Sequence, residues 1–378
     1  MIKKILQTIF KKFFYAFFSK LYGKIETSIT CEEDNRAKVK KVKIDNNLDY
    51  KIYKIQDSRL YTDRIQDTAI IVDNKIVDGP SFQFRHLKDS TWFIQDSKVN
   101  ENIVYTKGTP RFLKKINGNV LSLLTGGAGN NNYWHWLFDV LPRIGIFEKA
   151  FNLKDIDYFL VPDNARKFQD ETLSCLQISM KKVLSSKKFR HIKASEIIVT
   201  DHPVLTTGNA TNDILNIPIW ISKWLREKFI SEKIKNNKDV KNKIYIERDT
   251  ALSKKVPERS ISNEGEVKNY LKNCGFISVK LGEVSFNEQV NLFYNADYII
   301  GLHGAAFANL VFCRPGTKVL EFKSNTAGKA IPNLAKNNNL NYNSIATEVK
   351  HMYEYNFPTQ QGHIKIPMNE LKKIFNSH

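Results

Sequence analysis

The second half of the chain alternates between short apolar runs and amphipathic segments. Apolar, β-branched runs are typical of buried strands, and apolar residues spaced three and four apart are typical of helices. The pattern predicts strands at 243–248, 276–281, 298–300, 318–323 and 341–345, with helices between them at 263–273, 286–296, 305–313 and 329–336. Strands that alternate with such helices form a parallel sheet with right-handed crossovers. The second half therefore predicts an open α/β domain.

Residues 298–321, YIIGLHGAAFANLVFCRPGTKVLE, predict a strand, a turn of glycine and alanine, a helix and a second strand. Small residues at such a corner let a ligand phosphate approach backbone N–H groups and the positive end of the helix dipole. Ligands bind these sheets at the carboxyl ends of the strands. We expect that edge to carry Arg248, Glu283, the segment 301–306 and Glu321. The sequence has no G-x-G-x-x-G fingerprint and no Walker loop, which argues against NAD-type cofactors and ATP hydrolysis.

In the first half of the chain, the spacing of apolar residues is shorter and is typical of strands rather than helices. Short strands are predicted at 50–55, 68–72, 75–77, 91–94 and 103–105, and we interpret residues 25–120 as an irregular β-rich lead-in with no assigned chemistry. Strands at 157–161 and 196–200 around a helix at 165–178 extend the α/β alternation. The segment 202–242, with a helix near 218–234 and a charged run, is the predicted interdomain region.

The stretch LSLLTGGAGNNNYWHWLFDVLPRIGIFEKA, residues 121–150, predicts a Gly/Asn-rich loop and a helix that begins near Tyr133. His135 and Asp139 are four residues apart and share one helix face. Pro142 is expected to kink or end this helix. The core side is predicted to consist of Trp134, Leu137, Phe138 and Leu141. A histidine with a carboxylate partner is typical of a general base. A structural histidine in an aromatic core, hydrogen-bonded to Asp139, would have the same pattern.

Residues 1–24 have apolar positions at helical spacing over six turns. The other face holds Lys3, Lys4, Lys11, Lys12 and Lys20. The longest apolar run, 13–18, is too short to span a bilayer. This pattern predicts a basic amphipathic helix on an anionic membrane surface, and the alternative is a helix packed on the protein's own core.

Length and composition indicate the number of domains, the charge of the expected partners and the redox state of the cysteines. The 378 residues suffice for two domains, and the formal net charge of +19 favours an anionic partner, although solvated surface lysines explain part of it. Nucleic acid ranks last among such partners because no recognition motif accompanies the charge. The four cysteines are far apart with no metal-ligand spacing, as expected of reduced thiols in a cytoplasmic protein without a metal site.

Three blocks of the sequence resemble glycosyltransferase family 61. They are NNYWHWLFDVLPRI, YIERD with the downstream Arg259, and SFNEQVNLFYNADYIIGLHGAAFANLVFCRPGTKVLEF. The resemblance covers about 125–325 in the right order, and the branch we expect is that of bacterial capsular polysaccharide and lipopolysaccharide biosynthesis. Two positions depart from the family pattern, Ala306 in place of a glycine and Glu247 in place of a serine.

The resemblance implies a GT-B-type α/β architecture, in which two Rossmann-like domains face each other across a cleft. The predicted parts are the membrane-surface helix 1–24, a β-rich, Rossmann-like acceptor-side domain 25–215, a nucleotide-sugar-binding domain 240–350 and a C-terminal tail or helix 351–378. The implied reaction is inverting, metal-independent transfer of a sugar from a nucleotide sugar, with UDP as the expected nucleotide and no cofactor.

The resemblance also implies a site in each domain. The donor site would comprise Arg248, Lys254, Arg259, His303, Gly304, Ala305, Ala306, Asn309 and Glu321. Within it the backbone near residues 303–306 would hold the diphosphate, with Arg248 as its countercharge and Glu321 near the ribose. The catalytic pair would be His135 and Asp139, with Asp139 alone as the rival base, beside the acceptor-side residues Asn132, Trp134 and Arg143.

The sequence thus predicts a cytoplasmic, membrane-peripheral glycosyltransferase. Its acceptor would be a cell-surface polysaccharide or a lipid-linked glycan precursor, with residues 1–24 holding the enzyme beside it. The alternative is a non-catalytic carbohydrate- or membrane-binding assembly protein with a retained glycosyltransferase fold. A binding module needs no base opposite a phosphate site, which favours the enzyme.

Overall fold

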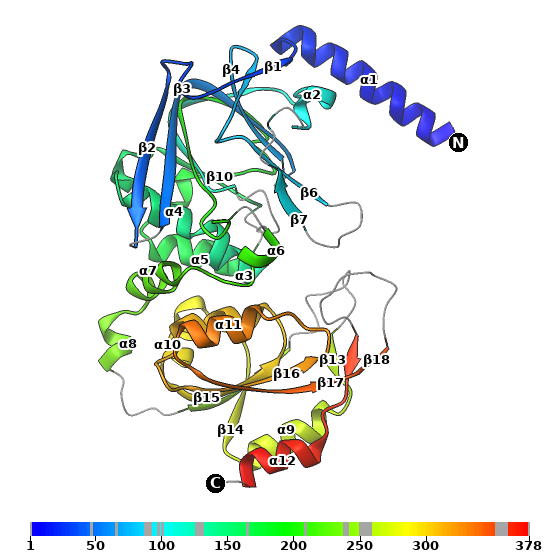
Figure 1. Ribbon diagram of the computed structural model, residues 1–378, viewed down its shortest axis with the longest axis vertical. Coiled ribbons are helices and arrows are strands. Elements are labelled where there is room, and N and C mark those ends of the chain that lie inside the picture. The colour runs from blue at the N-terminus through cyan, green and yellow to red at the C-terminus, as the bar shows by residue number, and fades with distance from the viewer. Residues whose placement is uncertain are drawn as a thin grey trace. The chain divides into compact units, whose positions relative to one another are not determined.

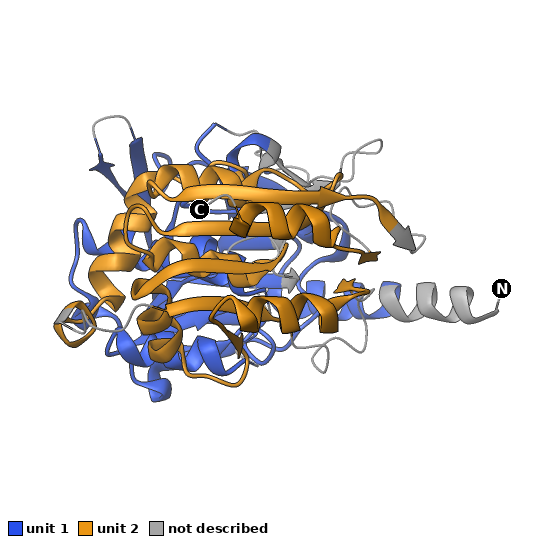
Figure 2. Ribbon diagram, turned by 90° about the horizontal axis from the view of Figure 1, so that it is seen from below, with its two compact units in different colours: residues 1–213 blue, residues 214–378 orange. Residues whose placement is uncertain are grey.

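The computed structural model describes residues 2–45, 48–64, 67–86, 93–96, 99, 102–124, 132–163, 166–207, 210–236, 242–248, 259–351 and 362–376. The chain divides into two compact units, residues 1–213 and 214–378, which Figure 2 colours blue and orange. The division falls inside the predicted interdomain region 202–242. The second unit therefore begins before the predicted residue 240 and extends past residue 350.

The second unit is built on a five-stranded sheet in which all neighbouring strands are parallel. The strands, in the order β14-β12-β15-β16-β17, are β14 (Phe276–Lys280), β12 (Asn242–Glu247), β15 (Ala296–Leu302), β16 (Lys318–Ser324) and β17 (Asn341–Thr347). The predicted parallel α/β sheet of the second half is confirmed. A small additional sheet joins β13 (Ser260–Ile261), β19 (His363–Ile364) and β18 (Val349–His351).

Helices cover both faces of this sheet (Figure 1). One face carries α10 (Phe286–Tyr294), the 3-10 helix η6 (Ala305–Phe312) and α11 (Ala330–Asn337), and η6 also contacts α7 (Ile219–Phe229). The predicted helix 218–234 is in fact two helices, because Ile230 is extended and α8 (Glu232–Asn236) starts afresh. The segment 305–313, expected to be α-helical, is a 3-10 helix buried from Phe307 to Phe312.

The opposite face carries α9 (Glu264–Asn273) and α12 (Met368–Asn376) (Figure 1). Leu371 of α12 is fully buried, and it belongs to the same apolar cluster as Leu271 of α9 and Ile300 of β15. Residues 368–376, predicted as part of a C-terminal tail or helix, form a helix that contributes to the core of the second unit.

The first unit contains an eleven-stranded mixed sheet. The strands are β1 (Thr27–Ile29), β2 (Ala37–Ile44), β3 (Leu48–Arg64), β4 (Asp67–Val72), β5 (Lys75–Val77), β6 (Phe82–His86), β7 (Phe93–Asp96), β8 (Lys114–Ser122), β9 (Tyr158–Val161), β10 (Val183–Ser185) and β11 (His191–Thr200). Parallel pairing joins β11, β8, β9 and β10, and β3 pairs antiparallel with β11. The β-rich segment is thus not a separate lead-in, because it continues the parallel sheet.

One predicted strand of the first unit is wrong. Residues 103–105 belong to the start of a helical turn, α2 (Val104–Lys107). The side chain of Asn102 accepts a hydrogen bond from the Val104 N–H (3.2 Å), and Gly108 follows with a φ of 61°. An asparagine side chain bonded to the backbone two residues on, and a glycine that adopts positive φ, favour a short helical turn over a strand.

The remaining helices of the first unit are α1 (Ile2–Tyr22), α3 (Tyr133–His135), the π-helix η2 (Trp136–Val140), α4 (Pro142–Glu148), η3 (Leu153–Asp155), α5 (Lys167–Cys175), η4 (Met180–Lys182) and α6 (Ala210–Asp213). Pro142 does not end the helix that carries His135. Instead the Leu141 N–H bonds Trp136 O (3.1 Å) in a π-helical turn, and Pro142 begins α4. None of the helices in the described ranges combines the length and apolar character needed to cross a membrane.

Candidate functional site

His135 and Asp139 form a close pair in the first unit. Asn132 starts their helix by accepting a hydrogen bond from the Trp134 N–H (3.0 Å). Trp134, Leu137, Phe138 and Leu141 are buried, as the helical spacing predicted. His135 Nδ1 lies 2.6 Å from Asp139 Oδ2. With Nδ1–H donated to the carboxylate, Nε2 is the ring atom that remains basic, which is the arrangement of a general base.

The neighbours of this pair come from the end of a parallel strand. Strands β8 and β11 run side by side, with Ser122 opposite Val199, so both end at one edge of the sheet. The chain after β8 leads to the helix of His135, and the chain after β11 continues as Asp201 and His202. Parallel pairing therefore brings residues about 65 positions apart to one edge.

The electrostatics of the cluster favour an ionised Asp139. Burial alone would raise the pKa of Asp139, but the charge and hydrogen bond of His135, with smaller effects from His202 and Arg143, lower the pKa overall. Burial lowers the pKa of His202 to about 3, so His202 is neutral, and its Nδ1 accepts hydrogen bonds from the backbone N–H groups of Val204 and Leu205 (both 3.2 Å). Asp139 therefore remains a carboxylate that can stabilise a protonated His135.

Arg143, which is buried, and Asp201, which is half-buried, belong to the same cluster. Arg143, predicted on the acceptor side, is almost fully buried and donates from Nη1 to Thr200 O (2.7 Å), which ties α4 to β11. Burial lowers the pKa of Arg143 to about 10 and raises that of Asp201, whose carboxylate accepts from the Lys51 N–H (2.7 Å). The positive charge of Arg143 also helps to lower the pKa of Asp139. Asn132 is exposed, whereas Trp134 is buried.

Sequence reasoning missed Asp201 and His202, which it assigned at most to an interdomain segment. The signal was present, because Asp-His-Pro directly follows the predicted strand 196–200. Polar residues after a parallel strand mark the binding edge of an α/β sheet. That argument was applied to the second half of the chain and not to the first.

The second unit has a topological switch point between β12 and β15. From β12 the chain passes through α9 to β14 on one side, and from β14 through α10 to β15 on the other side of β12. The carboxyl ends of β12 and β15 flank a crevice at such a point, where α/β proteins bind nucleotides. Arg248 follows β12, and residues 303–306 follow β15.

Two arginines stand close together at this edge. Burial, and then the neighbouring positive charge of Arg248, lower the pKa of Arg259 to about 10. No carboxylate in the described residues contributes to that shift. Two partly buried guanidinium groups are a setting for an anion such as a diphosphate. Lys254 lies outside the described residues, and Glu283, beyond β14, pairs with Lys280 (3.4 Å).

His303 is held by a buried carboxylate. Its Nδ1 bonds Glu321 Oε1, the Tyr342 hydroxyl donates to Glu321 Oε2, and the Lys323 Nζ lies 3.9 Å from that same oxygen. Glu321 is completely buried, so its position does not match the predicted place beside a ribose. The carboxylate instead orients His303, whose backbone N–H is bonded to Phe322 O (2.8 Å).

The end of β15 and the turn that follows it differ in the space they leave for an added side chain. A Cβ on Gly301 would lie 3.1 Å from Ile246 Cβ, whereas a Cβ on Gly304 would meet only Leu302 O, at 3.7 Å. Ala305 and Ala306 begin η6, and the first N–H groups of a helix have no partner within it. Asn309 is fully buried and donates to Gln289 Oε1 (3.0 Å), so it supports the turn rather than a ligand.

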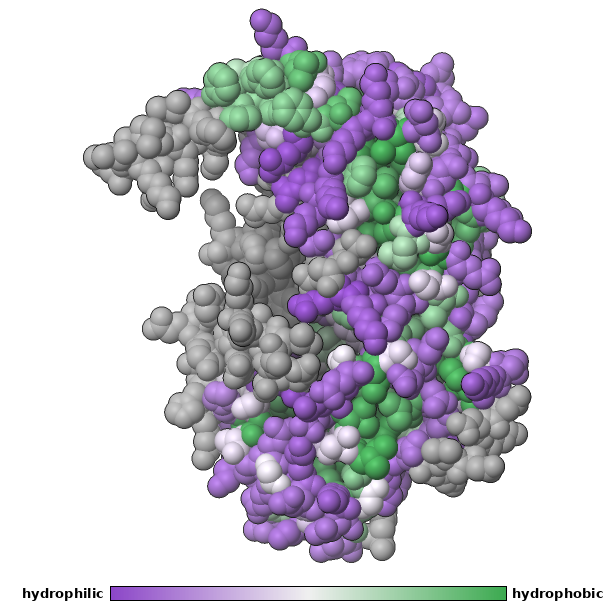
Figure 3. Space-filling model, turned by 180° about the vertical axis from the view of Figure 1, so that it is seen from behind, coloured by the Kyte–Doolittle hydropathy of each residue, from purple (hydrophilic) through white to green (hydrophobic). Residues whose placement is uncertain are grey.

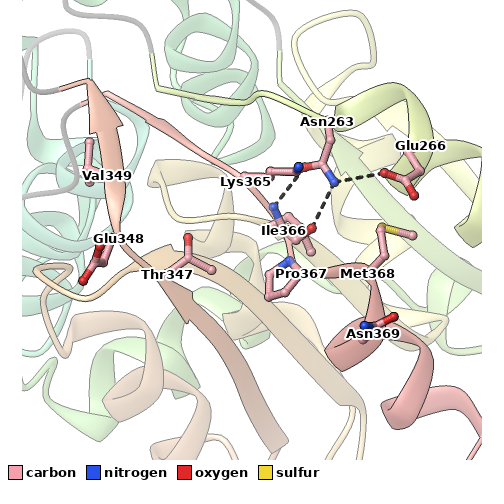
Figure 4. Close-up of a pocket in the computed structure, with 10 residues that line it drawn as sticks. All are labelled: Asn263, Glu266, Thr347, Glu348, Val349, Lys365, Ile366, Pro367, Met368 and Asn369. Carbon is pink, nitrogen blue, oxygen red and sulfur yellow. Dashed lines mark hydrogen bonds between the residues drawn. The ribbon is translucent and has the colours of Figure 1, made fainter.

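A cleft of about 720 Å³ with a mixed polar and apolar lining lies beside this sheet, between α9, the end of β17 and the start of α12 (Figure 4). Asn263 forms one wall. Its Oδ1 accepts from the Ile366 N–H (2.9 Å), and its Nδ2 donates to Ile366 O (2.9 Å) and Glu266 (3.4 Å), as the dashed lines show. These bonds engage the Asn263 side chain in holding the wall together. Within the described ranges no group of three His, Cys, Asp or Glu side chains could hold a metal ion.

The second unit is therefore an open parallel α/β domain, with its candidate site at the switch point. Comparison with known proteins narrows this class: residues 133–320 match the model of the family Glycosyltransferase 61. The matched residues contain His135, Asp139, Arg248 and His303. The resemblance inferred from the sequence blocks is thus confirmed at the level of the family.

Individual relatives agree with this match. Over 119 residues the chain is 30% identical to the EGF domain-specific O-linked N-acetylglucosamine transferase of Gallus gallus, and 28% identical to the proteins of that name in Canis lupus familiaris and Pan troglodytes. These alignments cover 30% of this chain and 21% or 22% of the relatives, so the chain spans about a fifth of their length. The family and these relatives support glycosyltransferase activity.

Proposed function

We propose that this protein is an inverting, metal-independent glycosyltransferase of the GT-B type. It moves a sugar from a UDP sugar to a hydroxyl of a cell-surface polysaccharide or a lipid-linked glycan precursor. The observation that carries the proposal is the His135–Asp139 pair, 2.6 Å apart, inside the residues that match family 61. A buried carboxylate bonded to Nδ1 is what a base on Nε2 requires.

The reaction needs a base for the acceptor and positive charge for the leaving group. Nε2 of His135 takes the proton of the acceptor hydroxyl while that oxygen attacks the anomeric carbon from the face opposite UDP. The bond between the anomeric carbon and the diphosphate oxygen breaks, and UDP leaves with the electron pair. Asp139 stabilises the imidazolium that forms, and attack from the opposite face inverts the anomeric centre.

The leaving diphosphate gathers negative charge, which the second unit is equipped to stabilise. Arg248 and Arg259 supply guanidinium groups, and Ala305 and Ala306 supply N–H groups at the start of η6. His303 has its Nδ1 occupied by Glu321, so its Nε2 is the ring atom that can meet a phosphate oxygen. This set provides the charge stabilisation that a metal-independent transfer needs.

The donor sugar and the cellular location belong to the same proposal. The names of the relatives specify N-acetylglucosamine, so UDP-N-acetylglucosamine is the first donor to test. We place the enzyme in the cytoplasm, on the inner face of the cell membrane, in the capsular polysaccharide or lipopolysaccharide branch of the family. No nucleic acid and no cofactor enters the reaction.

The test is UDP release by the purified protein with a panel of UDP sugars. We expect release with one sugar, a loss of about 10²- to 10⁴-fold in His135→Ala and Asp139→Asn with UDP binding retained, and weaker UDP binding in Arg248→Ala. Arg314→Ala is the matched control, since Arg314 pairs only loosely with Asp297 (3.8 Å). Full turnover in His135→Ala would overturn the assigned base. UDP binding without turnover for any sugar would favour a non-catalytic assembly protein.

A further inference from the structure

The C-terminal half of α1 is fastened to the first unit along one face. Phe18 is buried, and its ring centroid lies 5.2 Å from that of Phe112. The Tyr22 hydroxyl accepts a hydrogen bond from the Leu113 N–H (2.9 Å), and the Tyr22 ring packs edge-on against His191 (5.1 Å). The helix is therefore held by a buried ring and a hydrogen bond, and its orientation on this unit is set.

The face beside this contact, on the same helix, exposes large apolar side chains. Phe13, Phe17 and Leu21 are 64%, 45% and 52% exposed, and Phe112, from the segment before β8, is 69% exposed. Of the eight large hydrophobic side chains that are exposed in the described residues, these four lie together, and we call them the α1 patch. Figure 3 shows the apolar surface of this helix in green. A gathering of this kind marks a contact surface, whereas single exposed apolar residues need no explanation.

The charges around the α1 patch are positive. Lys12 and Lys20 are exposed on the same helix, and from residue 1 to residue 25 the sequence has no acidic residue. Lys24 follows the helix and pairs with Glu26 (2.6 Å). Apolar side chains flanked by lysines fit a layer that is apolar inside and anionic at its surface. A second copy of this chain fits less well, because a two-fold contact would bring like charges together.

We propose that the α1 patch inserts into the interface of an anionic phospholipid bilayer. Phe13, Phe17, Leu21 and Phe112 enter the acyl boundary, and Lys12 and Lys20 contact lipid phosphates. Because Phe18 and Tyr22 fasten α1 to the first unit, binding holds this unit at the membrane surface rather than on a loose tether. This surface is separate from the residues assigned to sugar transfer.

The test is co-sedimentation of the full chain with vesicles of phosphatidylcholine, with and without phosphatidylglycerol. We expect binding only when phosphatidylglycerol is present. The double variant Phe13→Ser/Phe17→Ser should bind at least about tenfold more weakly, and Lys12→Glu/Lys20→Glu about tenfold more weakly. Ile277→Ser, which changes a side chain of similar exposure (47%) on β14, should bind like the wild type.

Other outcomes would overturn the proposal. Equal vesicle binding by the wild type and Phe13→Ser/Phe17→Ser would exclude the α1 patch as the lipid contact. If the wild type ignores anionic vesicles but forms a dimer that this variant loses, the patch joins two copies instead. Far-ultraviolet circular dichroism confirms that each variant is folded, and UDP release without vesicles separates a failure here from a failure of the proposed activity.

Discussion

At the scale of single residues, the proposed chemistry rests on two histidine–carboxylate pairs. His135 and Asp139 lie four residues apart in one helical segment, whereas His303 and Glu321 come from neighbouring parallel strands, β15 and β16. In both pairs the carboxylate is buried and bonded to Nδ1, so Nε2 is the atom left for a ligand. The proposed proton acceptor in the first unit and the proposed phosphate contact in the second rest on the same geometry.

Gly301, in β15, and Gly304, in the turn that follows it, should respond differently to an added methyl group. Gly301→Ala puts Cβ 3.1 Å from Ile246 Cβ and should cost about 1–3 kcal/mol of unfolding free energy. Gly304→Ala has 3.7 Å of clearance and an extended φ of 169°, so stability should change by less than about 0.5 kcal/mol. Urea unfolding measures both.

The same pair tests the position of the phosphate. If the diphosphate lies at the start of η6, the methyl group of Gly304→Ala stands in its way, and UDP binding measured by calorimetry should weaken about tenfold or more. A Gly304→Ala protein that binds UDP as tightly as the wild type would show that the phosphates lie elsewhere.

At the scale of helices and strands, tertiary packing decides where a helix continues or ends, which the spacing of apolar residues predicts only approximately. The helix of His135 passes Pro142 through a π-helical turn, because the neighbouring Leu141 N–H reaches Trp136 O and proline itself has no N–H to place. Both sides of this turn are buried, so tertiary contacts support helical backbone on either side of Pro142, where the sequence alone predicted a kink or an end.

The last helix, α12, should contribute directly to the stability of the second unit. Leu371 is fully buried against α9 and the sheet, so Leu371→Ala removes buried methyl groups and should lower the unfolding free energy by about 2–5 kcal/mol. Lys372→Ala, at the exposed neighbouring position, is the control. If thermal unfolding of the two variants coincides, α12 is not part of the cooperative core.

At the scale of the whole molecule, one buried and one half-buried histidine make the first unit sensitive to acid. Burial lowers the pKa of His191 to about 4 and that of His202 to about 3. In the unfolded chain both titrate near about 6.5. Below about pH 6.5 the unfolded state binds protons that the folded state does not bind. The unfolding free energy is therefore highest above about pH 6.5 and falls as the pH decreases towards the pKa values of the folded state.

The expected loss is about 2 kcal/mol per histidine between about pH 7 and about pH 5. Urea titrations at several pH values, followed by circular dichroism, measure it. Both histidines lie in residues 1–213, so the transition of that unit should shift more than the transition of residues 214–378. In His202→Gln, unfolding in acid should take up about one proton fewer, so the unfolding free energy should depend less on pH. An unchanged pH dependence would contradict the low pKa assigned to His202.

The sequence by itself determined what depends on near neighbours. Helical spacing paired His135 with Asp139 and placed Trp134 and Phe138 in the core, and alternating periods predicted a parallel α/β sheet in the second half. The blocks that resemble family 61 rest on local sequence too, and the family match confirms them. These features are readable because a few residues along one helix or strand decide them.

Only the tertiary structure decided what depends on strand order. Periodicity shows that a strand exists but not which strand lies beside it, and pairing joins segments far apart in the chain. That is why His202 beside Asp139, the complete burial of Glu321 against Tyr342, and Phe112 beside α1 were not predicted. Each of these contacts follows from where the sheet or the core brings two distant segments together, which the spacing of residues along the chain does not encode.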